Sequence, residues 1–195
     1  RQGKTCLYFT TLSEPAIKVI RYMQEFDFFD AELLKERVIF ADLGRSIREG
    51  AERTLADIEA RVEKYQPAYV AIDSFRALGE LLRGDHDLRR FIYDLAVQMA
   101  GWGATTFMVG EYTRREYSSF AEFAIADGIL RLGSERQELT SVRELEVLKL
   151  RGSRYSSGKH FFDITRAGIE VYPRVSAPVD IQSQPSAASS ERVST

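Results

Sequence analysis

Short apolar runs alternate with amphipathic segments through residues 6–109 of this 195-residue chain. The apolar runs are rich in β-branched and aromatic residues, as buried strands are, and they cover 6–12, 37–43, 68–73 and 105–109. The intervening segments have helical spacing, over 15–29, 47–65 and 88–100. This alternation predicts βαβ units, and therefore an α/β fold with a mostly parallel central sheet flanked by helices.

The pattern changes after Phe120, where strand-like runs follow one another with little helix between them. These runs are 128–132, 144–150, 161–165 and 169–172. We expect them to extend the sheet as antiparallel edge strands. Residues 175–195 are rich in Ser, Ala, Pro and Gln and contain no aromatic residue, which predicts a linker or disordered tail after a single domain over residues 1–174.

Composition excludes several classes of protein. The formal net charge is −2, which gives no support for a broad basic face that binds nucleic acid, although a local basic patch stays compatible with it. The single cysteine, Cys6, rules out a disulfide within the chain, and with only two histidines a structural zinc site is not expected. No apolar stretch is long enough to span a bilayer and no signal-peptide pattern is present, so a cytoplasmic protein is the simplest interpretation.

The triplet Gly3-Lys4-Thr5 matches the end of a Walker A phosphate loop. The full motif needs an earlier glycine, a preceding strand and a following helix, whose N-terminal amides hold the phosphates. Here the triplet is followed by "CLYFTTL", which is typical of a strand. We therefore interpret the triplet as a polar turn that leads into a strand.

Two carboxylates are placed to reach one edge of the predicted sheet. The run "PAYVAIDSF" ends its strand at Asp73, and "LYFTTLSE" ends at Glu14. Ligands bind at the carboxyl edge of open α/β sheets, where an aspartate can hold Mg²⁺ and a glutamate can activate water. Each residue also has a simpler interpretation: Asp73 as the start of a turn, and Glu14 as an acid at a helix N-terminus.

Lys149 and Arg151 form the third candidate group. They lie two residues apart in a predicted strand, so they project from one face, and the Gly152 turn follows. Two adjacent cations can clamp phosphate oxygens, but charges also protect solvated edge strands, and the residues alone leave both interpretations open. Glu111, Arg114 and Arg115 follow the strand that ends at Val109 and lie near the same edge, without an assigned role.

Several segments together resemble the KaiC family of RecA-superfamily ATPases. They span residues 6–173 and include "YFTTLSEP", "YVAIDSF", "GATTFMVGEYTRREYSSFAEFAIADGILRL" and "LEVLKLRGSRYSSGKHFFDITRAGIEVYP". The last segment is the most specific, because it contains the Lys-Leu-Arg-Gly sequence typical of the family. The resemblance implies a RecA-like domain that binds ATP and Mg²⁺ and forms a ring, expected to be a hexamer.

The resemblance implies roles only at matching positions. Glu14 matches the second glutamate of the catalytic pair, whereas Ser13 stands at the first, so the pair is broken. Asp73 matches the Walker B aspartate, which holds Mg²⁺ through water. The segment expected to contact nucleotide bound to the neighbouring subunit comprises Lys149, Leu150, Arg151 and Ser153. Tyr155 and Arg166 differ from the family's residues, and we carry no contact over to them.

The resemblance also suggests how the chain's two ends relate to a longer protein. "RQGKT" is similar to the basic turn before the family's second strand, which implies that the true phosphate loop and first helix lie upstream of Arg1 and that this chain alone is inactive. "ERVST" is similar to the opening of a second KaiC domain. Regulatory protein partners are compatible with this interpretation, and whether the parent protein phosphorylates itself stays open. The alternatives are a non-catalytic scaffold module and a relative of DNA recombinases.

Overall fold

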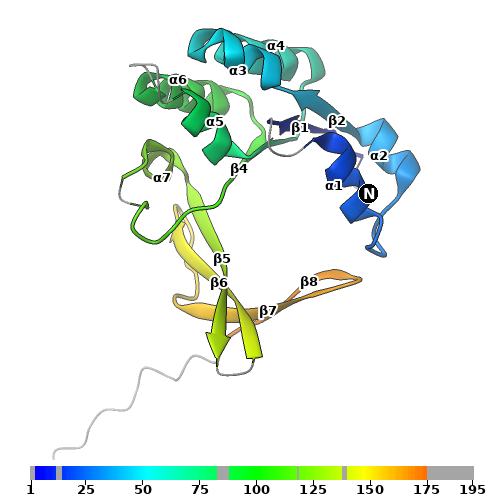
Figure 1. Cartoon of the computed structure of the whole chain (residues 1–195), viewed down its shortest axis with the longest axis vertical. Coiled ribbons are helices and arrows are strands. Elements are labelled where there is room, and N and C mark those ends of the chain that lie inside the picture. The colour runs from blue at the N-terminus through cyan, green and yellow to red at the C-terminus, as the bar shows by residue number, and fades with distance from the viewer. Residues whose placement is uncertain (1–2, 12–14, 83–87, 118, 138–139, 175–195) are drawn as a thin grey trace, which may run out of the picture.

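The computed structural model describes residues 3–11, 15–82, 88–117, 119–137 and 140–174 (Figure 1). Glu14 and the predicted tail, 175–195, lie outside the described residues. The elements are β1 (Cys6–Thr10), α1 (Ala16–Met23), α2 (Ala31–Arg37), β2 (Val38–Asp42), α3 (Gly44–Glu49), α4 (Ala51–Tyr65), β3 (Tyr69–Asp73), α5 (Phe75–Leu82), α6 (Leu88–Gly101), β4 (Thr105–Val109), α7 (Ala121–Ile125), β5 (Gly128–Gln137), β6 (Thr140–Leu150), β7 (Lys159–Thr165) and β8 (Gly168–Tyr172).

The four predicted strands of the first half form one parallel sheet, which we call sheet A. Its strand order is β2-β1-β3-β4, with Thr10 level with Asp73 and Asp73 level with Val109. Parallel strands are joined by helical crossovers, which allow the strand order to differ from the chain order. The expected α/β class with a parallel sheet and flanking helices is confirmed.

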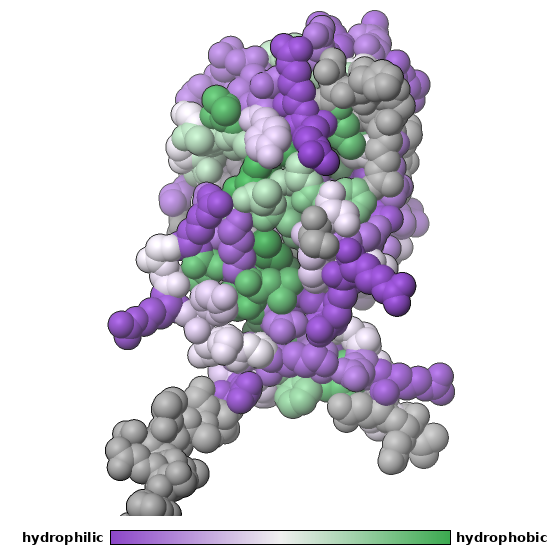
Figure 2. Space-filling view, turned by 90° about the vertical axis from the view of Figure 1, so that its left-hand side faces the viewer, coloured by the Kyte–Doolittle hydropathy of each residue, from purple (hydrophilic) through white to green (hydrophobic). Residues whose placement is uncertain are grey.

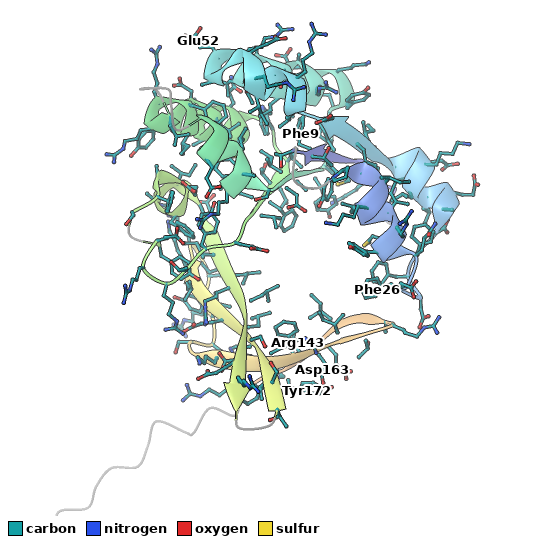
Figure 3. All side chains as sticks on the ribbon, viewed as in Figure 1. Phe9, Phe26, Glu52, Arg143, Asp163 and Tyr172 are labelled. Carbon is teal, nitrogen blue, oxygen red and sulfur yellow. The ribbon has the colours of Figure 1, made fainter. Side chains whose placement is uncertain are left out.

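The hydrophobic core lies between one face of sheet A and helices α3 to α6. Alternate strand residues point into it, as the period of two requires. Phe9 (Figure 3), Leu7, Val70 and Ile72 are fully buried. Ile58 of α4 and other apolar helix residues fill the space above these strands. The opposite face of sheet A is less well covered, since Phe107 of β4 is 52% exposed.

The helices depart from the predicted pattern in two places. The helix expected over 15–29 ends at Met23, and the chain continues in turns. Within these turns, the amide of Asp27 donates to the carbonyl of Arg166 in the distant β7–β8 turn, at 2.8 Å. The helix expected over 47–65 is two helices, α3 and α4. They are separated by Gly50, whose φ of 105° is accessible to glycine and breaks the helical path.

The four C-terminal strands are antiparallel, as expected, but they do not extend sheet A. Within the described residues they pair only with one another, as sheet B, in the order β5-β6-β7-β8. The segment 110–127, which contains α7, carries the chain away from the edge of β4 before β5 begins (Figure 1). Cross-strand ion pairs such as Arg143 with Asp163 tie sheet B together (Figure 3).

Sheet B has an apolar face that reaches the surface. Leu130 and Leu132 of β5 are 65% and 55% exposed, and Ile164 and Ile169 are also exposed on the same side of β7 and β8. Apolar groups likewise surface on the side of the molecule formed by α6 and α7 (Figure 2). In the described part of the chain, no helix combines the length and the apolar character that crossing a membrane requires.

Candidate functional site

Asp73 lies where the sequence predicts it, at the carboxyl end of the central strand β3. The Tyr8 hydroxyl, on the neighbouring strand β1, donates a hydrogen bond of 2.5 Å to Asp73 Oδ2. Tyr8 and Asp73 meet because alternate residues of parallel strands face the same side of the sheet. The Tyr8 hydroxyl therefore orients the Asp73 carboxylate and uses one of the hydrogen-bond acceptor positions of Oδ2.

The backbone beside Asp73 is cross-linked to β1 through Thr11. The Thr11 amide donates to the Asp73 carbonyl at 3.1 Å, and the Thr11 hydroxyl accepts from the Ser74 amide at 3.1 Å. Ser74 then caps α5, since its hydroxyl accepts from the Ala77 amide at 3.3 Å. The strand end that carries Asp73 is thus held by hydrogen bonds to the end of β1, and the residue after it caps α5.

Lys149 and Arg151 converge on the last turn of α7. Lys149 Nζ donates to the carbonyls of Phe123 and Ala124 at 3.2 and 3.0 Å. Arg151 Nη2 donates to the same Ala124 carbonyl at 3.3 Å, and Nη1 pairs with Asp127 Oδ1 at 3.2 Å. Two like charges are tolerated together here because carbonyl groups at a helix C-terminus carry partial negative charge. Both cations keep further N–H donors that can bind an anion.

Leu150 lies between these two cations in the sequence, and Ser153 lies two residues after Arg151. Leu150 is the last residue of β6, and Ser153 follows Gly152, whose φ of 72° allows the chain to turn directly after Arg151. Both residues are exposed. Their predicted contacts with nucleotide stay predictions.

The loop after β4 is organised by Arg76 of α5. Arg76 Nη1 donates to the Glu111 carbonyl at 2.8 Å and to both carboxylate oxygens of Glu116 at 2.9 Å. The hydrogen bond from Arg76, followed by those from Thr113, lowers the pKa of Glu116 to about 2. Arg114 reaches sheet B instead, where it lies 3.5 Å from Glu146.

Tyr112 connects this loop to α7. Its hydroxyl donates to Glu122 Oε1 at 2.9 Å, and its ring meets the Phe123 ring edge-on at 4.8 Å. Burial, and then the charge of Glu122, raise the pKa of Tyr112 well above its usual range, so the hydroxyl stays a donor. Sequence patterns did not single out Tyr8, Tyr112, Asp127 or the α7 carbonyls, because their roles depend on partners distant in the chain.

Asp73 and the Lys149–Arg151 pair belong to different sheets. Among the described residues no hydrogen bond or ion pair joins them, and no three His, Cys, Asp or Glu side chains are grouped to hold a metal. A pocket of about 370 Å³ lies at the amino ends of β1 and β2, lined by Cys6, Leu33 and Val38 among others, which is the opposite edge of sheet A from Asp73.

The residue types nevertheless suit Mg²⁺ and ATP. The Asp73 carboxylate is a hard oxygen donor of the kind Mg²⁺ prefers, and one or two such groups suffice when phosphates and water supply the other ligands. Ammonium and guanidinium groups are the usual partners of phosphate oxygens. By their chemistry, Asp73 suits a metal ion and the Lys149–Arg151 pair suits phosphate, and binding of either group at these residues stays a prediction.

Sequence comparison identifies relatives across most of the chain. The family profile described as "ATPase: KaiC" matches residues 1–176. The circadian clock oscillator protein KaiC of Synechococcus elongatus is 27% identical over 177 residues, covering 85% of this chain and 34% of that protein. KaiC of Acaryochloris marina is 31% identical over 120 residues, covering 60% of this chain and 23% of that protein. The chain thus spans about a third or less of the length of these relatives.

Comparison with solved structures agrees on the fold. The crystal structure of a KaiC-like protein from the hyperthermophilic archaeon Pyrococcus horikoshii matches with a TM-score of 0.73 and 24% sequence identity. The match covers 88% of this chain and 77% of that chain. At this identity the likeness shows a shared fold.

Proposed function

The chain belongs to the KaiC ATPase family, and from this we propose that it is part of a domain that binds and hydrolyses ATP within a ring of subunits. The ring is expected to be a hexamer, and nucleotide state would control the binding of regulatory partners. The convergence of Lys149 and Arg151 on one carbonyl, in a sheet separate from Asp73, is the observation that carries the proposal. Two groups of this kind, on separate sheets, suit a nucleotide bound between subunits.

Each predicted residue would have a separate task. Asp73, oriented by Tyr8, would hold Mg²⁺ through water, and the bound ion would neutralise charge on the phosphates. Glu14 would orient and deprotonate the attacking water. Lys149 and Arg151 would bind the phosphates of ATP held by the neighbouring subunit, beside Leu150 and Ser153.

Exposed apolar surfaces support the further proposal that an additional segment or a neighbouring subunit covers part of sheets A and B. Strands of parallel sheets are normally covered on both faces, yet Phe107 and Val109 of β4 are exposed. Leu130 and Leu132 of sheet B are exposed as well. Because the Gly3-Lys4-Thr5 triplet is followed by strand β1 and not by a helix that could hold phosphates, we expect that the 195-residue chain by itself neither holds ATP tightly nor hydrolyses it.

Calorimetric titration tests this function. Mg²⁺ and ATP titrated into the 195-residue chain should give weak binding, and inorganic tripolyphosphate should bind weakly at Lys149 and Arg151. Substituting both residues by alanine should abolish the tripolyphosphate signal, whereas Arg143→Ala, which removes a cation elsewhere in sheet B, should retain it. Tight ATP binding by the chain, or tripolyphosphate binding that survives the double substitution, would contradict the proposal.

A non-catalytic scaffold is the second candidate, and Ser13 is the observation that favours it. Without the first glutamate of the pair, water activation would depend on Glu14 alone. Steady-state ATPase assays of the complete protein separate the two functions. Turnover that is lost in Glu14→Gln supports the enzyme, and nucleotide binding without turnover supports the scaffold.

A further inference from the structure

The last turn of α7 cannot hold two cations unless α7 itself is held in place. At five residues, α7 is too short to be a stable helix without tertiary contacts. Its first and last residues, Ala121 and Ile125, pack against the hydrophobic core. Its polar anchor is Glu122, which is only 7% exposed.

Tyr112 supplies the hydrogen bond that Glu122 receives. Glu122 Oε1 accepts from the Tyr112 hydroxyl, while Oε2 is buried without a hydrogen-bond partner in the described part of the chain. A buried carboxylate with a single partner depends strongly on that partner. Tyr112 also packs edge-on against Phe123, the residue whose carbonyl receives Lys149.

Tyr112 is in turn fixed from the side of sheet A. The guanidinium of Arg76 lies over its ring, 5.6 Å from the ring centre, and also bonds the carbonyl of the preceding residue, Glu111. Arg76 is three residues beyond Asp73. A continuous set of contacts therefore runs from the Asp73 strand end through Arg76 and Tyr112 to α7, and from α7 to Lys149 and Arg151.

We propose that Tyr112 is a positioning residue, which holds α7 so that its terminal carbonyls bring Lys149 and Arg151 together as a phosphate clamp. Tyr112 does not touch the phosphate. Its hydroxyl acts through Glu122, and its ring acts through Phe123. This inference rests on the proposed function for the identity of the anion, but the placement of the two cations does not depend on that identity.

The test uses the 195-residue chain and two measurements. Binding of inorganic tripolyphosphate reports the clamp, and the NMR signal of the Arg151 side-chain Nε–H reports how rigidly that cation is held without any anion. Tyr112→Phe should weaken tripolyphosphate binding by about threefold to tenfold, the range that loss of one hydrogen bond can produce, and should increase the mobility of Arg151.

Two variants serve as controls. Tyr117→Phe removes a hydroxyl from the other ring that packs on Phe123 and should change neither measurement. Glu122→Gln keeps an oxygen that accepts from Tyr112 and should stay close to wild type. If Tyr112→Phe prevents folding, Phe123→Leu replaces it, because it removes the ring contact and keeps the carbonyl that binds Lys149.

The results separate the two proposals. Unchanged affinity and an unchanged Arg151 signal in Tyr112→Phe would overturn the positioning role, and so would equal losses in Tyr117→Phe. If the wild-type chain does not bind tripolyphosphate, the phosphate function fails. The Arg151 signal alone then decides the positioning role: greater mobility in Tyr112→Phe supports it, and no change refutes it.

Discussion

Sheet A and sheet B are stabilised in different ways. Sheet A buries Leu7, Phe9, Val70 and Ile72 completely under α3 to α6, whereas Phe162 is the apolar residue of sheet B that is buried in the described structure. Sheet B exposes Leu130 and Leu132, and its strands are joined by backbone pairing and by surface ion pairs such as Arg143 with Asp163. Sheet A thus carries its own core, while sheet B presents an apolar face that a further segment or subunit can cover.

Truncation of a core residue in sheet A should give the largest effect. Phe9→Ala removes a fully buried ring and should lower the free energy of unfolding by about 3 to 5 kcal/mol. Urea unfolding followed by circular dichroism measures this loss. Leu132→Ala in sheet B is the matched control, and a loss as large as that of Phe9→Ala would refute the asymmetry between the sheets.

The cross-link beside Asp73 should contribute less. Thr11→Val keeps the shape of the side chain but removes the hydroxyl that accepts from the Ser74 amide, so the free energy of unfolding should fall by about 1 to 3 kcal/mol. Amide hydrogen exchange should show faster exchange at Ser74 than in the wild type. Protection of Ser74 equal to that of the wild-type chain would show that Thr11 does not hold this strand end.

The exposed apolar face of sheet B should tolerate a polar substitution that the core under sheet A would not. Leu130→Gln should change the stability of the 195-residue chain by no more than about 0.5 kcal/mol, because the side chain is mostly exposed. If a further segment covers this face in the complete protein, the same substitution should lower the free energy of unfolding of that protein by much more. Equal, small effects in both proteins would show that nothing packs there.

Acid should reveal the contribution of one ion pair, in the loop after β4. Because the pKa of Glu116 is lowered from 4.5 to about 2 in the folded chain, its pairing with Arg76 stabilises the fold above pH 4.5 and is lost as the pH falls toward 2. Glu116→Gln should therefore lower the melting temperature at neutral pH, and the difference from wild type should shrink through this interval. A difference that does not depend on pH would argue against the ion pair.

The parallel half of the fold was predictable because its signals are local. Runs such as 68–73 and 105–109 are apolar and short, helical spacing separates them, and the resulting βαβ interpretation is confirmed. The break at Gly50 was not predictable from periodicity, since the flanking residues keep helical spacing. The early end of α1 was not predictable from periodicity either, and the turn that follows it bonds Arg166, a residue far away in the sequence, through the amide of Asp27.

The pairing of strands and the surroundings of the site were harder to predict. Apolar pattern identifies β5 to β8 as strands but not their partners, so the expected extension of sheet A was wrong in the described structure. Asp73 and the Lys149–Arg151 pair follow from strand ends and period-two spacing. The roles of the α7 carbonyls and of Tyr112 could not be predicted in this way. A five-residue helix is too short to show periodicity, and every residue has a backbone carbonyl, so the sequence does not indicate which carbonyls accept hydrogen bonds.

If Asp73 and the Lys149–Arg151 pair act on one ATP from two neighbouring subunits, mixing two inactive variants of the complete protein should restore ATPase activity. Rings made only of Asp73→Asn, or only of Lys149→Ala/Arg151→Ala, should be inactive. Mixed equally and reassembled, they should regain about a quarter of wild-type ATPase activity, because that share of interfaces in a ring with head-to-tail contacts then combines two intact halves. No recovery on mixing, although mixed rings form, would contradict the claim.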